Sequence, residues 1–295
     1  MNRLKKTSWF DWLLVLFMLI VCVVTLYPFL HVMALSFNDA TDAVRGGIHI
    51  IPREFTFDNY IHIFTNNSNL IRAFGNSILR TVIGTATGVL ACAICAYVLS
   101  RKHFVFKKTV STLLIVTMYV SGGLIPWFLL IRNLGLMNNF AVYIIPSLIS
   151  AFNVIVIRSF MEGLPDALEE SAKIDGANDF TIFIKIILPL CTPVIATVAL
   201  FIAVGQWNSW FDTYLFARNN IALTTLQFEL MKILENANVN ISQVNPQTAQ
   251  NLVNRVSPTS IRMAITMVAT LPILFVYPFV QKYFVSGLTI GAVKS

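Results

Sequence analysis

Charged residues are scarce in this sequence. Only 12% of its 295 residues are Asp, Glu, Lys or Arg, whereas 56% are hydrophobic. A soluble domain carries roughly 25% charged residues, so this composition excludes a soluble globular enzyme. It favours a chain that lies mostly in a membrane, where a spanning helix needs about 20 consecutive apolar residues to satisfy its backbone hydrogen bonds internally.

The sequence also lacks motifs for nucleotide or metal chemistry. No G-x-x-x-x-G-K-[ST] phosphate loop occurs, so we expect no ATP site and no other cofactor in this chain. Cys92 and Cys95 form a C-x-x-C inside an apolar run, but no histidine or acidic residue accompanies them, and we expect no metal site. No nucleophile and base pair up at one membrane depth, so no catalytic residues are predicted.

Asp, Glu and Lys are missing from the centres of the apolar runs. Ion-coupled carriers use such residues to relay protons or bind sodium ions, and they usually contain paired repeats, which are not seen here. These absences disfavour an ion-coupled secondary carrier, which stays as an alternative function for the chain.

Six apolar runs are long enough to cross a membrane. They cover Trp12–Ser36, Asn76–Leu99, Val110–Ile131, Phe140–Met161, Pro189–Phe211 and Ser260–Tyr283. Gly122, Gly123 and Pro126 are expected to kink or break the third run, and Pro146 the fourth. We predict an all-α polytopic membrane protein with six transmembrane helices in a single domain, residues 1–295.

Small residues repeat along the second run. Gly84 and Gly88 form a G-x-x-x-G pattern that continues through Cys92 and Ala96. Small side chains at this spacing let two helices approach closely in a membrane. The pattern predicts a helix-packing face.

Basic residues beside the spans indicate the orientation, because Lys and Arg concentrate on the cytoplasmic side. With six spans, one side receives the N-terminus, the loop over 101–108 and the C-terminus. The basic residues there are Arg3, Lys5, Lys6, Arg101, Lys102, Lys107, Lys108, Lys282 and Lys294. We expect both termini in the cytoplasm. Topology thus accounts for the net charge of +7, and no nucleic-acid partner is expected.

The acidic cytoplasmic segment Glu162–Leu188 has the pattern of a helix-turn-helix. Pro165 and Asp166 favour a helix start, and Gly176 favours a stop because glycine accepts the left-handed conformation at a helix end. Asp179 is expected to cap a second helix that ends near Pro189. The segment is therefore more ordered than a simple loop between spans.

Apolar residues recur at helical spacing in this segment. They are Ile174, Ala177, Phe180 and Phe183. Such a surface fits a groove in a partner protein. The alternative is an amphipathic helix lying on the membrane, but those helices are usually basic, and the acidic charge here disfavours it.

This segment resembles the EAA loop of ABC importer permeases in residue type and spacing. The matching residues are Glu170-Ser171-Ala172, Gly176, Ile186 and Leu188-Pro189, with Ser171 in place of the usual alanine. Other segments are similar to the carbohydrate branch, the maltose-type permeases: Leu164-Pro165-Asp166, Ile174-Asp175-Gly176-Ala177, Ala96-Tyr97, Ser100-Arg101, Gly135-Leu136 and Trp207-Asn208. The ending Val285–Ser295 is similar to permeases that import fragments of plant or algal polysaccharides.

The resemblance implies a permease subunit of a binding-protein-dependent oligosaccharide importer in the bacterial inner (plasma) membrane. It also implies a second homologous permease in a heterodimer, two ATPase subunits that bind ATP and magnesium, and a solute-binding protein. The 162–188 loop would then couple the ATPases to the membrane helices. The coupling residues implied are Glu170, Ser171, Ala172, Asp175, Gly176, Ala177, Ile186, Leu188 and Pro189.

Polar and aromatic residues within the spans are candidates for the substrate pathway, because sugars offer hydroxyls for hydrogen bonds and C–H faces for stacking. They are Tyr119, Asn153, Gln206, Trp207, Asn208 and Trp210. The alternative is structural, since Trp often anchors a span end and Asn or Gln often bonds a neighbouring helix. Neutral sugars and acidic alginate- or pectin-type fragments both stay open, because Arg80 or Arg132 would attract uronic acids if either faced the pathway.

Overall fold

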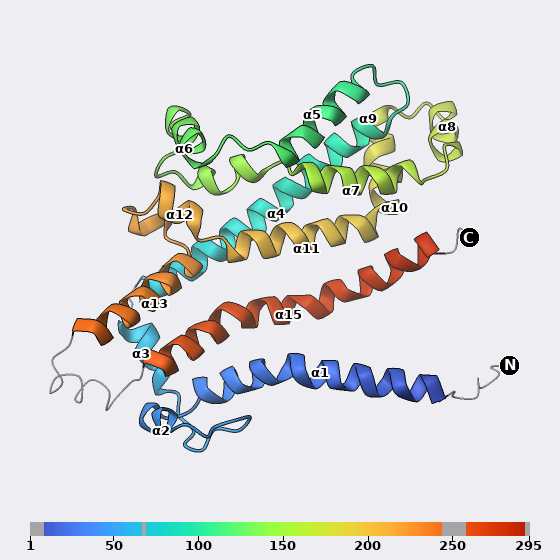
Figure 1. The fold of residues 1–295 in the computed structure, drawn as a ribbon. Coiled ribbons are helices and arrows are strands. Elements are labelled where there is room, and N and C mark those ends of the chain that lie inside the picture. Colours follow the sequence, from blue (N-terminus) through green and yellow to red (C-terminus); the bar gives the residue numbers. More distant parts are fainter. Residues whose placement is uncertain (1–8, 67–68, 244–257, 293–295) are drawn as a thin grey trace. The chain divides into compact units, whose positions relative to one another are not determined.

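The computed structural model describes residues 9–66, 69–243 and 258–292, and the described residues form helices and no strand (Figure 1). The all-α prediction is confirmed for this part of the chain. Chain contacts divide it into two compact units, one of residues 1–68 with 232–271 and one of residues 69–231 with 272–295. Each unit is described by itself.

The first unit contains α1 (Trp9–Ser36), α2 (Ala40–Arg45) and α3 (Asp58–Asn66). Its turn after α1 is closed by Asn38, whose side chain accepts hydrogen bonds from the backbone of Arg53 and Glu54 at 2.8 and 2.9 Å. The Asn38 amide also donates to Asp42, which pairs with Arg53 at 3.1 Å. The apolar stretch of α1 has no buried residues, so it presents its side chains outward.

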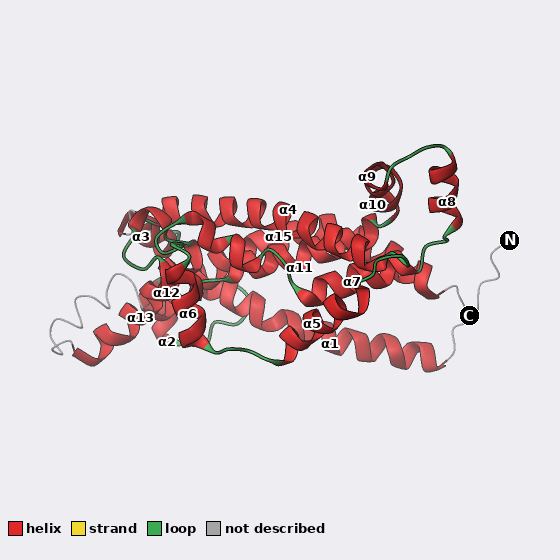
Figure 2. Cartoon of the chain, turned by 90° about the horizontal axis from the view of Figure 1, so that it is seen from above, coloured by secondary structure: helices red, strands yellow, loops and turns green. Residues whose placement is uncertain are grey.

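The second unit is built on α4 (Leu70–Ser100), α7 (Ala151–Glu162) and α11 (Thr192–Asn208), which lie side by side (Figures 1 and 2). The small-residue face predicted on the second run is confirmed. Cys92 and Ala96 are fully buried in the core, and a Cβ on Gly88 would lie 3.3 Å from Ile202 of α11. Small side chains therefore set the close approach of α4 and α11.

Further elements complete the described part of the chain. They are α5 (Lys107–Tyr119), α6 (Leu124–Asn133), the 3-10 helices η1 (Phe140–Tyr143), η2 (Ile145–Ser147) and η4 (Ile221–Leu223), α8 (Ala167–Ile174), α9 (Asp179–Ile182), the π-helix η3 (Phe183–Ile187), α10 (Leu188–Leu190) and α12 (Phe211–Phe216), with α13 (Leu226–Gln243) and α15 (Pro258–Ala292). Both views place α8 and α9 at one end of the second unit and α6 and α12 at the other (Figures 1 and 2). We name them the inner end and the outer end after the predicted cytoplasmic position of the 162–188 loop.

Fewer than six continuous spans appear in the described part of the chain. Three helices are long and apolar enough to cross a membrane: α1, α4 and the 259–276 part of α15. Two pairs of consecutive helices give at most two further spans, if each pair is counted as one bent span. They are 140–147 with 151–162, bent by 48°, and 179–190 with 192–208, bent by 82°. By length and composition the structure thus supports three to five spans, and the count of six stays a prediction.

The third predicted run, Val110–Ile131, is not one helix. It separates into α5 and α6 because the chain is extended at Val120 and takes a positive φ of 84° at Gly123. The break expected at Gly122 and Gly123 is confirmed, but it shortens both pieces below the length of a span. The fourth run likewise begins as η1 and η2 before α7.

Candidate functional site

The 162–188 loop folds as the predicted helix-turn-helix at the inner end of the second unit. Its first helix, α8, ends in a Schellman motif: Gly176 donates to the Lys173 carbonyl at 3.0 Å, and Ala177 donates to the Ala172 carbonyl at 2.9 Å. Gly176 has a φ of +81°, a conformation that disfavours any residue with a Cβ. The sequence therefore fixes the turn at this position.

The cap of the second helix differs from the prediction. Asn178, not Asp179, caps α9, because its side-chain oxygen accepts from the Thr181 amide at 2.8 Å. Asp179 is the first residue of the helix, and its backbone carbonyl instead accepts from the Tyr97 hydroxyl at 3.2 Å. An acidic residue in the first turn still suits the positive end of the helix dipole.

The loop has a packed side and an exposed side. Phe183 was grouped with the partner-facing residues, but it is buried in the core, where its ring lies 5.0 Å from that of Tyr97. Ile174 and Phe180 remain 86% and 69% exposed. Of the implied coupling residues, Ala172 is buried, Ala177, Ile186 and Leu188 are half-buried, and Glu170, Ser171, Asp175, Gly176 and Pro189 are exposed.

Two acidic residues of the loop, one largely buried and one exposed, pair with the segment between α4 and α5. Glu169 pairs with Arg101, and Asp166 pairs with Lys102. The Lys102 hydrogen bond lowers the pKa of Asp166, and the same bond raises the pKa of Lys102. Glu170 forms no ion pair with any described residue, although it is the neighbour of Glu169. The exposed Glu170 carboxylate is therefore available on the same loop as Ile174 and Phe180, its two most exposed apolar side chains.

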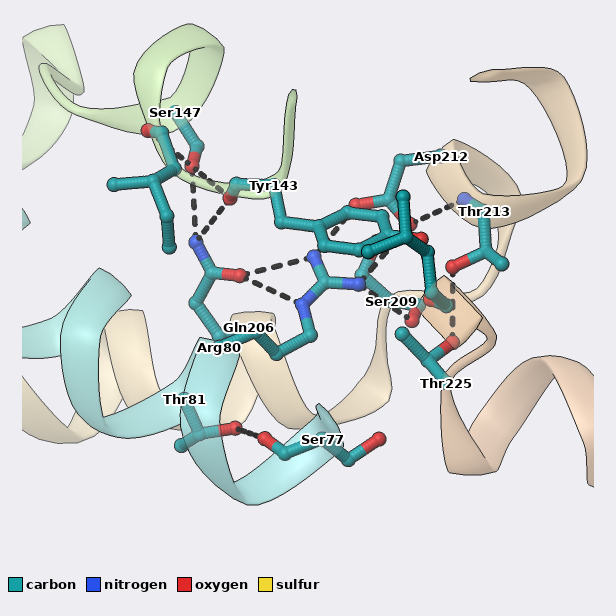
Figure 3. A network of polar contacts seen from close by, with 12 residues as sticks. Ser77, Arg80, Thr81, Tyr143, Ser147, Gln206, Ser209, Asp212, Thr213 and Thr225 are labelled. Atoms are coloured by element: carbon teal, nitrogen blue, oxygen red, sulfur yellow. Dashed lines mark hydrogen bonds and ion pairs between the residues drawn. The ribbon is translucent and has the colours of Figure 1, made fainter. Parts of the chain in front are cut away.

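A second polar cluster lies at the outer end of the same unit, around Arg80 of α4 (Figure 3). The Arg80 guanidinium donates five hydrogen bonds, two to the Gln206 side chain at 2.9 and 3.0 Å, two to Asp212 at 2.5 and 3.1 Å and one to the Ser209 carbonyl at 3.3 Å. Its carbon centre lies 4.5 Å from the centroid of the Tyr143 ring. Arg80 is only 2% exposed, so its charge is neutralised within the protein.

Gln206 connects the η1–η2 segment, which precedes α7, to the Arg80 cluster. Its amide donates to the Tyr143 carbonyl at 3.1 Å and to the Ser147 hydroxyl at 2.9 Å, while its carbonyl accepts from Arg80. The residue thus joins α4, α11 and the η1–η2 segment. A Cβ on Gly84 would lie 2.8 Å from the Gln206 amide nitrogen, so only glycine leaves room for this arrangement.

A pocket of about 340 Å³ opens beside the Arg80 cluster. Trp127, Tyr143, Pro146 and Phe216 supply apolar and aromatic walls, and Asn153 supplies an amide. The Asn153 residue is 7% exposed, and its side chain forms no hydrogen bond with another described residue. An aromatic pocket with an uncommitted amide suits a hydroxyl-rich ligand with apolar C–H faces.

The six predicted pathway residues are not gathered at one place. Only Asn153 and Gln206 line the pocket, and Gln206 is committed to Arg80. The others lie elsewhere: Tyr119 is 84% exposed at the end of α5, Trp207 packs against Phe74, Asn208 is exposed and accepts a hydrogen bond from Gln227, and Trp210 contacts the rings of Phe211 and Tyr214.

Sequence reasoning missed the pairing of Arg80 with Asp212. An arginine inside an apolar helix needs a counter-ion, and this signal was present in the sequence. It did not identify the partner, which lies 132 positions later in the chain. Trp127 and Tyr143, which also line the pocket, were missed as well.

Comparisons with known proteins show which proteins this chain is similar to. A family model described as "Binding-protein-dependent transport system inner membrane component" matches residues 87–290. The chain is similar to the polygalacturonan/rhamnogalacturonan transport system permease protein YtcP of Bacillus subtilis (strain 168), with 38% identity over 98% of this chain and 99% of that protein. It is also similar to protein LplC of the same organism, with 39% identity over 100% of this chain and 98% of that one.

A solved structure has the same fold. It is a chain of a bacterial ABC transporter involved in the import of the acidic polysaccharide alginate, with a TM-score of 0.82 and 28% sequence identity. The match covers 95% of this chain and 99% of that chain.

Proposed function

The chain belongs to the family of binding-protein-dependent transport system inner membrane components, and we propose that it carries an oligosaccharide across the membrane by alternating access driven by ATPase subunits docked on its 162–188 loop. It is a permease of the sugar and oligosaccharide importers of this family, and an ion-coupled carrier is not supported. Such permeases work with a solute-binding protein and with ATPase subunits.

The observation that carries the docking proposal is the two-sided character of the loop. One side of the loop packs against the rest of the unit through Ala172 and Phe183. On the other side, Glu170, Ile174 and Phe180 are exposed around the Gly176 turn. Two large apolar side chains are unfavourable to leave in water, whereas the carboxylate is well solvated there, and the three together fit an apolar cleft that contains a basic residue. This supports placing the ATPase contact on the face formed by these three residues.

The substrate pathway in this proposal runs past the pocket at the outer end. Asn153 offers hydrogen bonds to sugar hydroxyls, and Trp127 offers a face for stacking. Because Asp212 neutralises Arg80, the pocket adds no free charge for a uronic acid. We propose an oligosaccharide released from a plant or algal polysaccharide; if it is acidic, residues other than Arg80 must bind its carboxylates.

The partners follow from the same proposal. A second, different permease completes the membrane pair, two ATPases bind ATP and magnesium, and this chain binds no nucleotide of its own. Both termini lie in the cytoplasm, on the side of the 162–188 loop. The exposed apolar length of α1 then faces lipid or the second permease.

Reconstitution tests this function. The chain is co-purified with its ATPases, placed in proteoliposomes with the binding protein, and assayed for ATP hydrolysis with neutral and with uronic-acid oligosaccharides. We expect Glu170→Lys to abolish co-purification of the ATPases, while Ser171→Ala on the same helix leaves it unchanged. Uptake that follows an ion gradient without any associated ATPase would overturn the proposal.

A further inference from the structure

Three residues at the inner end of α4 have no role in the function proposed so far. Tyr97, Ser100 and Arg101 close the helix immediately before the α4–α5 turn, and all three contact one another. The Arg101 guanidinium stacks over the Tyr97 ring, 4.3 Å from its centroid. It also donates to the Ser100 hydroxyl at 3.0 Å. These contacts fix the direction in which the guanidinium points.

Arg101 points at Glu169 of α8. The two side chains form an ion pair in which each is about four-fifths buried, at 21% and 19% exposure. The other carboxylate oxygen of Glu169 accepts from Lys173 at 2.8 Å. Both oxygens of Glu169 are thus occupied within this chain, whereas the adjacent Glu170 is exposed and unpaired among the described residues. Two neighbouring glutamates therefore face different partners.

A second contact joins α4 to the other half of the loop. The Tyr97 ring packs on Phe183, and its hydroxyl donates to the Asp179 carbonyl at 3.2 Å. The stacked pair Tyr97 and Arg101 therefore holds α8 through Glu169 and the start of α9 through Asp179. These links do not depend on the covalent connections of the loop, which run to α7 and α11.

The helix that receives these contacts is continuous. α4 runs unbroken from Leu70 to Ser100, and Arg80 lies on it 20 positions before Ser100, which corresponds to about 30 Å along the axis. A continuous helix that is held at its last turn and carries the Arg80 cluster about two-thirds of its length away is a physical route between two sites.

We propose that Arg101 and Glu169 form a positioning pair that transmits displacement of the 162–188 loop to α4, and through α4 to the outer pocket. The inference rests on the proposed function, since it requires an ATPase that moves the loop. Neither residue touches the ATPase or the sugar. The nearby pair Lys102–Asp166 joins the same two segments but is 73% and 65% exposed, so it contributes little and serves as the matched control.

A double-mutant cycle in the reconstituted importer tests this pair. Arg101→Gln, Glu169→Gln and the double variant are compared for ATPase co-purification, thermal unfolding, and sugar imported per ATP hydrolysed. We expect co-purification to stay near that of the unchanged protein, the unfolding temperature to fall because the pair is mostly buried, and import per ATP to fall about fivefold in each single variant. The double variant should fall no further than either single one, because the pair is lost only once.

The control and the contrary outcomes are distinct. Lys102→Gln with Asp166→Asn should leave import per ATP unchanged, and Arg101→Lys should keep more coupling than Arg101→Gln because it retains the charge. Additive losses in the double variant, or full coupling in the single variants, would overturn the inference. Loss of ATPase binding in Glu169→Gln would also overturn it, since Glu169 would then lie on the docking face. Failure of the proposed function itself is recognised separately, because the unchanged protein would then bind no ATPase.

Discussion

The two ends of the second unit hold charge in opposite ways. At the outer end, one buried arginine uses all its donors on Gln206, Asp212 and Ser209, and no charge is left over. At the inner end, the Arg101–Glu169 pair is about one-fifth exposed, the Lys102–Asp166 pair is mostly exposed, and Glu170 is an exposed carboxylate that forms no ion pair with another described residue. The outer cluster fixes a structure, whereas the inner cluster orients a surface and keeps it available.

Energetics explain why the two arrangements differ. A buried ion pair is costly to break because the remaining charge cannot return to water, while an exposed pair exchanges its partner for water at little cost. A rigid outer cluster suits a wall that must keep its shape. An exposed inner cluster suits a contact that forms and separates with another subunit.

The largest expected effect tests whether the charge pairing of Arg80 stabilises the outer end. Arg80→Met leaves the Asp212 carboxylate and the Gln206 carbonyl without their donor, and we expect the free energy of unfolding to fall by about 3 kcal/mol. Thermal unfolding in detergent measures it. Adding Asp212→Asn should recover part of the loss, because no unpaired charge then remains. If the double variant is less stable than the single one, the outer cluster is not held by charge pairing.

The next effect tests the packing behind the same cluster. Gly84→Ala places a Cβ 2.8 Å from the Gln206 amide nitrogen, and Gln206 is held on three sides, so we expect a loss of about 1–3 kcal/mol in unfolding free energy. Gly75→Ala on the same helix meets nothing within 4 Å and should be neutral or slightly stabilising. Equal effects of the two substitutions would show that close packing at Gly84 is unimportant.

The third test moves to the inner end. Gly176→Ala meets no neighbouring atom, so its cost is the positive φ alone, about 1–2 kcal/mol confined to the loop. Hydrogen exchange of the 167–190 amides should quicken while that of α4 and α11 stays unchanged. Exchange that quickens throughout the unit would mean that the loop and the helices unfold together, which would remove the contrast between the two ends.

The smallest effect concerns the exposed Lys102–Asp166 pair. Its contribution is present above the ordinary pKa of an aspartate and is lost as pH falls through the lowered pKa of Asp166; at high pH it is lost as pH rises through the raised pKa of Lys102. The stability difference between the unchanged protein and Lys102→Gln should therefore be small and constant from about pH 5 to pH 9. Unfolding temperatures of both proteins across this range measure the difference. If the difference changes markedly with pH, another titrating group interacts with the pair.

The sequence predicted the local features of the molecule better than its long-range ones. The turn at Gly176 and the helix before it are determined by residues that are close in the sequence. The turn and α8 were therefore predicted correctly. Phe183 was misassigned because helical spacing does not distinguish the face toward Tyr97 from the face toward a partner. The docking role of the loop and the sugar contacts stay predictions.

The outer pocket was beyond sequence reasoning for a physical reason. Gln206 contacts Arg80 across 126 positions, and nothing local to either residue indicates the other. The break in the third run was predicted from its glycines, but its consequence, the exposure of Trp127 to the pocket, depends on where α6 packs. Pairing at this separation requires the tertiary structure.

The order of synthesis gives the Arg80–Asp212 pair one more consequence. Arg80 leaves the ribosome 132 residues before its counter-ion, a delay on the order of ten seconds at ordinary elongation rates. An unpaired arginine in a membrane helix costs about 3 kcal/mol on insertion scales. During that interval the Arg80 end of α4 is more stable near water or lipid headgroups than in hydrocarbon, and its pair with Asp212 forms only after the later segment is made. An early helix of the permease thus gains its buried ion pair only when a late segment of the chain has been synthesised.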